Sequence, residues 1–321
     1  MIKNISLIIS TFKREKQLSD IIESLAKQLN NDLNLEVIVC DSGSNYNSII
    51  FNNFKKNLTI RYFDIRKNIL SAKRNFGILK AMNSYIILLD DDCIPEHDFL
   101  KHYVKEFSSI DESTILSGIV NYPLKYIKKN NYIKFRDSKH FKYESINKKS
   151  DLDIDKIVAM NMGFIKTKKI IKLGLFDENF TGYGFEDYEF AFRYKNNGFI
   201  LKRTLASIIH DEGEPNFNRY LKKYFHLGRD GMKNLIKVNK ISAQATIYHK
   251  IESNFLFKIL TKIGKLSNLL LFLEGLIVKV NDYQKFYIPA LYDIARLSSY
   301  TRGYIDRNKL NLMDKNKSWY E

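Results

Sequence analysis

The chain has 321 residues, of which 45% are hydrophobic and 27% are charged, so it can bury a substantial core and is not a disordered protein. Four prolines and two cysteines exclude a proline-rich chain and a disulfide framework, which makes a reducing compartment such as the cytoplasm the expected location. The net charge is +16, and almost all of the excess lies after residue 100, because residues 1–100 carry 13 basic and 12 acidic side chains.

The first hundred residues alternate strand and helix patterns. Apolar runs predict four strands, at residues 5–10 (ISLIIS), 35–40 (LEVIVC), 58–63 and 85–89 (YIILL), and periodic runs predict helices at 15–29 and 71–82. Strands this continuously apolar are typical of a parallel sheet with helices on both faces. The sequence therefore predicts an α/β fold with a Rossmann-like, doubly wound and mostly parallel sheet, which binds ligands at the carboxyl ends of its strands.

The pattern changes after residue 120. Residues 121–149 are basic and aromatic without a clear period, which predicts an extended loop or a small insertion, expected to close over a ligand. Further strands are predicted at 159–165, 199–204 and 206–209, and helices at 168–173 and from 182 to about 195. Only helices are predicted after residue 216, at 221–240, 248–280 and 289–304. The apolar run at 266–280 is too short and too charged to predict a transmembrane helix.

Polar residues follow three of the predicted strands, namely Thr11, Asp41 and the triplet Asp90-Asp91-Asp92. Three adjacent carboxylates repel one another unless a cation lies nearby. In an extended chain Asp90 and Asp92 point to the same side, where they could hold Mg²⁺ or Mn²⁺. The spacing alone leaves open the alternative of a solvated acidic turn.

Six stretches, in chain order, resemble family 2 glycosyltransferases of the GT-A fold. They are IISTFKREKQL, VIVCDSGSNYNS, LSAKRNFGILKA, the acidic triplet followed by Pro95, LGLFDENFTGYGFEDYEFAFRY and IIHDEG. The fifth stretch is similar to the acceptor-site segment of galactosyltransferases, whereas the family's usual proline after the first strand is absent. The resemblance implies a GT-A domain over residues 1–215, with a nucleotide-binding half (1–100) and an acceptor half (101–215), and a helical region over 216–321.

The resemblance also implies a role for each site residue. Asp187 is expected to be the catalytic base and Glu186 to contact the acceptor hydroxyl. Asp92 and His210 are expected to bind a Mn²⁺ or Mg²⁺ ion that neutralises the departing diphosphate. Contacts to the nucleotide sugar are expected from Thr11, Arg14, Asp41, Arg74, Asp90 and Asp91, and Asn161 and Gly163 are expected to line the sugar pocket.

Simple structural interpretations remain open for several of these residues. Asp41 can close a turn, and Arg74 can be a surface charge at the start of a helix. Acids such as Glu186 and Asp187 stabilise a helix N-terminus in any protein.

Together these features predict an inverting, metal-dependent hexosyl- or N-acetylhexosaminyltransferase that uses a nucleotide sugar, expected to be a UDP-sugar. The expected acceptor is a glycan or lipid-linked glycan in bacterial surface polysaccharide synthesis, and a peptide or protein is the alternative. The positive charge leaves open another class, a basic protein that binds anionic lipid or nucleic acid. No nucleic-acid motif occurs, so nucleic acid is not expected. The basic helices after residue 218 could place the protein at the inner face of a membrane, or they could simply form a basic outer surface.

Overall fold

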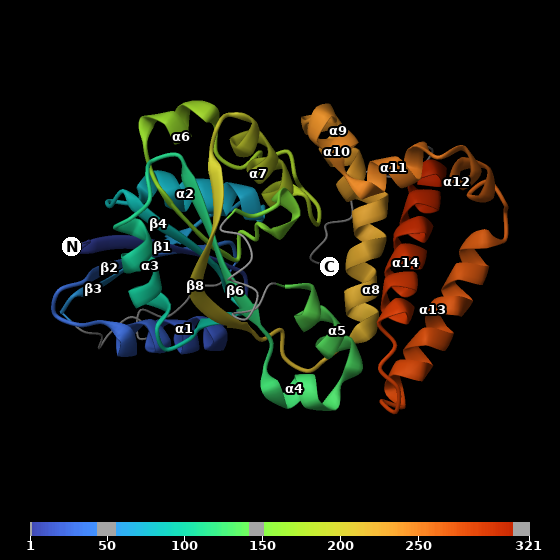
Figure 1. The fold of residues 1–321 in the computed structure, drawn as a ribbon, viewed down its shortest axis with the longest axis horizontal. Helices are drawn as coiled ribbons and strands as arrows, with labels where there is room; N and C mark the ends of the chain where they lie inside the picture. The colour runs from blue at the N-terminus through green and yellow to red at the C-terminus, as the bar shows by residue number, and fades with distance from the viewer. Residues whose placement is uncertain (1, 44–55, 141–150, 311–321) are drawn as a thin grey trace. The chain divides into compact units, whose positions relative to one another are not determined.

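The computed structural model describes residues 2–43, 56–140 and 151–310 (Figure 1). The chain forms two compact units. The first unit contains Met1–Pro123, Lys139–Glu178 and Phe190–Glu212, and the second contains Leu124–Ser138, Asn179–Glu189 and Gly213–Glu321. The domain boundaries expected at residues 100 and 215 stay predictions.

The first unit is built on one mixed sheet with the strand order β3-β2-β1-β4-β7-β6-β8-β5. Four parallel neighbours form one side: β1 (Asn4–Thr11), β2 (Asn34–Asp41), β3 (Leu58–Asp64) and β4 (Tyr85–Asp90). The other side contains the parallel pair β6 (Thr114–Asn121) and β8 (Ile200–His210), with β7 (Asn161–Ile165) and β5 (Cys93–Pro95) running antiparallel to their neighbours. The predicted α/β sheet is confirmed.

Helices cover both faces of the parallel strands (Figure 1). Helix α1 (Glu15–Gln28) connects β1 to β2, and helix α2 (Leu70–Lys80) connects β3 to β4. In the sheet β2 and β4 lie on opposite sides of β1, so the two connections run in opposite directions. Right-handed crossovers in opposite directions place these helices on opposite faces of the sheet. Further helices of this unit are α3 (Phe99–Phe107) and α6 (Lys168–Leu173).

Several sequence-based expectations differ from the structure. The runs predicted as two strands after residue 198 form the single strand β8. The segment predicted as an extended loop contains two short helices, α4 (Leu124–Lys129) and α5 (Asn131–Lys139), while residues 141–149 lie outside the described residues. In α5, Tyr132 stacks on Phe217 with ring centroids 5.2 Å apart and Phe135 stacks on Tyr292 at 5.0 Å. The segment therefore contributes to the core of the second unit, and two helices this short show no sustained period.

The second unit consists mainly of helices. They are α8 (Phe217–His226), the π-helical turn η4 (Leu227–Gly231), α9 (Met232–Val238), α10 (Lys240–Ala245), α11 (Ile247–Ser253), α12 (Phe255–Leu260), α13 (Leu266–Asp282) and α14 (Pro289–Leu310). The single helix predicted over 248–280 is wrong, because Asn254 and Gly264 separate three helices there. A Cβ at Gly303 would overlap the Phe225 carbonyl, which explains how α14 packs so closely on α8. Among the described helices none is both long and apolar enough to cross a membrane.

Gly77 allows α2 to lie directly on the sheet, and this contact can be tested. A Cβ at this position would overlap Ile8 of β1 and lie 3.2 Å from Cys40 Sγ of β2. We expect Gly77→Ala to lower the free energy of unfolding by about 1–3 kcal/mol, since both neighbours are fully packed. Urea titration followed by circular dichroism measures this.

The matched control is Gly275→Ala, because a Cβ at Gly275 in α13 meets no atom within 4 Å. That change should leave stability unchanged or raise it by up to about 1 kcal/mol through the better helix propensity of alanine. Equal effects of the two substitutions would contradict the close packing of α2.

Candidate active site

The ends of three parallel strands bring the predicted site residues to one edge of the sheet. Thr11 at the end of β1 pairs in register with Asp41 at the end of β2. On the other side of β1, Ser10 pairs with Asp90 at the end of β4. The predicted clustering of polar residues at the carboxyl ends of these strands is therefore confirmed.

Each carboxylate of the acidic triplet has a cationic partner. Asp90 forms an ion pair with Arg74 at 2.9 Å, and Arg14 lies 3.2 Å from Asp91 and 2.7 Å from Asp92. β4 ends at Asp90 and the next two residues form a turn. The premise of an extended chain through Asp92 therefore does not hold, and Asp90 and Asp92 pair with different arginines.

Burial and charge shift the pKa values in this cluster in different directions. Burial raises the pKa of Asp91 to about 6, against the opposing effect of Arg14. Burial also acts to raise the pKa of Asp92, but His210 and Arg14 outweigh it and hold that pKa well below its usual range. Burial acts to lower the pKa of Arg14, but Asp92 and Asp91 together raise it above its usual range. Asp92 is therefore a carboxylate at neutral pH.

His210 and Asp92 have the separation that two ligands of one metal ion need. His210 ends β8, and its Nε2 lies 3.4 Å from Asp92 Oδ1. Two adjacent ligands at about 2.1 Å from an octahedral ion lie about 3 Å apart. The other ring nitrogen, Nδ1, is buried and forms no hydrogen bond within the described part of the chain. All polar interactions of this ring therefore pass through Nε2.

Two neighbours of this pair were not predicted. Glu212 Oε1 lies 3.6 Å from His210 Nε2, so it offers a further oxygen beside the pair. Cys93 also lies within reach, since one ligand atom each from Cys93, Asp92 and His210 lie within 4.8 Å of one another. Burial raises the pKa of the Cys93 thiol well above its usual range, and Mn²⁺ and Mg²⁺ prefer oxygen ligands. The donor set therefore fits a hard divalent cation held by Asp92 and His210.

The β1–β2 side of the same edge contains a second polar cluster. Asp41 is fully buried and accepts hydrogen bonds from the Ser42 amide at 2.7 Å and from the Tyr62 hydroxyl at 2.8 Å. The bond to Ser42 agrees with the structural interpretation of Asp41 as a turn residue. Lys73 was not predicted; its Nζ donates to the Thr11 carbonyl at 2.8 Å, and burial lowers its pKa to about 8. The interpretation of Arg74 as a surface charge is wrong, because only 4% of its side chain is exposed.

Glu186 and Asp187 lie in the second unit, at the start of α7 (Glu186–Asn196), a helix that continues into the first unit. Gly184 and Phe185 before them have φ values of +88° and +73°, so the turn is strained for Phe185 and natural for glycine. Both carboxylates are half-buried, and Asp187 Oδ1 accepts a hydrogen bond from the Tyr188 amide at 2.8 Å. The helix-stabilising role of the acids is therefore present, and a catalytic role stays a prediction.

Core packing explains the two residues expected to line a sugar pocket. Asn161 is fully buried; its amide donates to the Ile119 and Ala206 carbonyls, and its oxygen accepts from the Tyr103 hydroxyl. A Cβ at Gly163 would overlap the Tyr103 ring. The sugar-pocket expectation is wrong for both residues.

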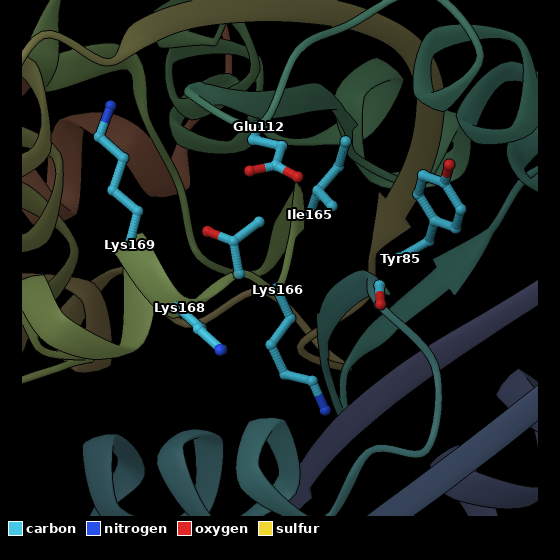
Figure 2. Close-up of a pocket in the computed structure, with 8 residues that line it drawn as sticks. Tyr85, Glu112, Ile165, Lys166, Lys168 and Lys169 are labelled. Atoms are coloured by element: carbon cyan, nitrogen blue, oxygen red, sulfur yellow. The ribbon is translucent and has the colours of Figure 1, made fainter.

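An open pocket of about 550 Å³ lies away from this edge, at the opposite end of β4 (Figure 2). Tyr85, the first residue of β4, lines it together with Lys166, Lys168 and Lys169. Figure 2 shows the amino group of Lys169 pointing away from those of Lys166 and Lys168. Lys166 donates to the Ala81 carbonyl and Lys169 to the Ser113 hydroxyl, so the lysines do not converge on one ligand.

Comparison with known proteins identifies the family. Residues 6–172, more than half of the chain, match the model of "Glycosyl transferase family 2". The chain belongs to glycosyl transferase family 2. The family resemblance seen in the sequence motifs is thereby confirmed.

Two of the relatives, both polysaccharide synthases by name, are much longer than this chain. It is 30% identical over 246 residues to a hyaluronan synthase of Pasteurella multocida, which covers 66% of the chain and 24% of that protein. It is 27% identical over 252 residues to a chondroitin synthase of Escherichia coli, which covers 67% of the chain and 35% of that protein. The chain thus spans about a quarter to a third of the length of these relatives.

Solved structures share the fold. A mannosyltransferase of Pyrobaculum calidifontis in complex with GDP-Man and Mn²⁺ superposes with a TM-score of 0.59 at 13% identity, over 96% of this chain and 88% of that one. Residues 1–349 of S. aureus TarS in complex with UDP-GlcNAc give a TM-score of 0.54 at 13% identity, over 97% and 91%. The predicted GT-A-type fold with a helical C-terminal region is confirmed.

The ion pair of Arg74 and Asp90 yields a test of the site's electrostatics. Arg74→Met removes the partner of a carboxylate whose side chain is only 22% exposed. We expect it to lower the free energy of unfolding by about 3 kcal/mol, the lower end of the range for breaking a buried pair. Adding Asp90→Asn should restore part of that loss, because no unpaired charge then remains. Urea titrations of the single and double variants measure this, and an additive double variant would contradict the pairing.

Proposed function

We propose that this family 2 chain transfers a sugar from a UDP-sugar to an acceptor hydroxyl, with inversion and with Mn²⁺ or Mg²⁺. The observation that carries the proposal is the pair of Asp92 with the buried His210, which lies at the carboxyl edge of a GT-A-type sheet that also presents Asp41. One protein of the same fold was solved with UDP-GlcNAc and another with GDP-Man and Mn²⁺; both support a nucleotide-sugar donor, the first supports UDP and the second supports the metal.

The donor half of the proposed reaction belongs to the first unit. Asp41 and Thr11 would contact the nucleoside, and Arg14, Arg74, Asp90 and Asp91 would surround the ribose and diphosphate. When bound, the metal ion held by Asp92 and His210 neutralises the charge that develops on the leaving diphosphate. Arg14 uses Asp92 Oδ2, while Asp92 Oδ1 faces His210, so one carboxylate can serve both partners.

The acceptor half of the proposed reaction rests on Asp187, with Glu186 holding the acceptor. The acceptor oxygen forms a bond to the anomeric carbon while its proton passes to the Asp187 carboxylate. The bond between the anomeric carbon and the diphosphate oxygen breaks, and its electron pair leaves with the diphosphate. This single displacement needs no covalent intermediate, and it inverts the configuration at the anomeric carbon.

A hexose or N-acetylhexosamine is the proposed sugar, and a glycan or lipid-linked glycan is the proposed acceptor. The names of the hyaluronan and chondroitin synthases support polysaccharide synthesis. The chain is at most 30% identical to them, and the match covers only 24% and 35% of their length. The comparison therefore does not specify the sugar or the linkage, and a screen of nucleotide-sugar donors tests the sugar.

The metal role of Asp92 and His210 can be tested through UDP binding. We expect Asp92→Ala and His210→Ala each to abolish donor hydrolysis and to remove the gain in UDP affinity that Mn²⁺ produces, because each variant loses one of two protein ligands. Isothermal titration with and without Mn²⁺ measures this. Asp98→Ala is the control, since Asp98 lies before α3 with 46% of its side chain exposed. A folded Asp92→Ala variant with normal Mn²⁺-dependent UDP binding would exclude the metal role.

The roles of Asp187 and Glu186 can be separated by kinetics. Asp187→Asn keeps the shape of the side chain but removes its basicity, so transfer should fall by at least about 100-fold, the lower range for a general base. UDP affinity in Mn²⁺ should be unchanged. Glu186→Gln should instead raise the apparent KM for the acceptor.

Steady-state transfer assays with each variant distinguish these outcomes. Normal transfer by Asp187→Asn with loss in Glu186→Gln would exchange the two roles. Loss of UDP binding in both variants would assign the segment to the donor site and contradict the proposed division.

A further inference from the structure

Helix α13 of the second unit buries two polar side chains and exposes several large apolar ones. Its buried residues are Glu274, Ile277 and Asn281, which form one stripe along the helix. Glu274 accepts a hydrogen bond from Ser298 at 3.0 Å and pairs with Arg302 at 2.7 Å, both in α14. Asn281 accepts from the Tyr292 hydroxyl at 3.1 Å. Two polar side chains of α13, Glu274 and Asn281, thus pack inside, against α14.

The outward side of this region is apolar. Thirteen of the 23 exposed large hydrophobic side chains in the described part of the chain lie within residues 255–288, and they are called the apolar face below. Six of them are more than 60% exposed: Phe255, Leu256, Leu269, Phe272, Tyr283 and Phe286. Soluble monomers rarely expose so many large apolar side chains on adjacent elements, so a partner that covers them is expected.

Lysines accompany the apolar face almost without acids. Residues 255–288 contain five exposed lysines, namely Lys258, Lys262, Lys265, Lys279 and Lys285. Asp282 is the one exposed acid in this segment, since Glu274 is buried. The segment therefore exposes large apolar side chains together with an excess of lysines over acids.

We propose that the apolar face binds the surface of an anionic lipid bilayer. Apolar side chains would enter the boundary between headgroups and acyl chains, and the lysines would contact anionic headgroups. The described helices are too short or too polar to span a bilayer, so α12 and α13 would lie in its plane. A second copy of the chain fits less well, because a two-fold contact through this face would bring like-charged lysines together.

This inference goes beyond the proposed reaction and does not depend on it. None of the residues assigned to donor, metal or acceptor lies within 255–288. A bilayer contact would hold the protein at the surface where lipid-linked acceptors lie, but the contact itself is a property of the helical unit alone.

Flotation of the full chain with vesicles tests the proposal. We expect binding to vesicles of phosphatidylcholine mixed with phosphatidylglycerol, and at least about tenfold weaker binding to pure phosphatidylcholine or at high salt. Phe272→Glu combined with Leu276→Glu on α13 should lower binding to the anionic vesicles by at least about tenfold. The matched control is Leu79→Glu, because Leu79 is 61% exposed on α2 and lies outside the apolar face.

Two further measurements keep the outcomes separate. The unfolding temperature should be equal in the wild type and the Phe272→Glu/Leu276→Glu variant, which would show that the variant is folded. UDP affinity should also be equal, because the apolar face is separate from the donor site, so failure of this proposal would not contradict the proposed reaction. Absence of binding to anionic vesicles, or equal binding by all variants, would overturn the proposal. Light scattering that shows a dimer in the wild type and a monomer in the variant, without vesicle binding, would assign the face to self-association instead.

Discussion

The site depends on how the fold balances three adjacent carboxylates at the end of one buried strand. Asp90, Asp91 and Asp92 would repel one another, and β4 lies between strands that shield it from water. Ion pairs offset this repulsion: Arg74 pairs with Asp90, and Arg14 pairs with both Asp91 and Asp92. Because each arginine comes from a different element, the acidic triplet ties the loop after β1 and helix α2 to the end of β4.

Because Arg14 pairs with Oδ2 of Asp92, Oδ1 of the same carboxylate is available to His210. His210 reaches it because β5 turns back and pairs with the end of β8, which places Cys93 opposite His210. The pair is thus assembled from strands that are more than a hundred residues apart in sequence, and a hard divalent cation fits between these two ligands. The proposed transfer reaction follows from this arrangement together with membership of glycosyl transferase family 2.

The sequence was sufficient for the first four strands and for α1 and α2, because continuous apolar runs and clear helical periods leave few alternatives, but β5, α3 and β6 were not predicted. It was also sufficient for the clustering of Thr11, Asp41 and Asp90, since parallel strands end at one edge. Lys73 and Glu212 were missed, although each lies within two residues of a predicted site residue. The helices of residues 124–139 were missed because they are short, and the apolar face because only the packing of α13 on α14 shows which side of that helix is buried.

The most direct test of the central claim is an anomalous difference map from crystals grown with UDP and Mn²⁺. The account predicts a manganese peak bonded to an Asp92 oxygen and to His210 Nε2, with the diphosphate completing its coordination. UDP bound with no manganese peak there, or with the peak on other side chains, would contradict the assignment of this edge as the metal and donor site.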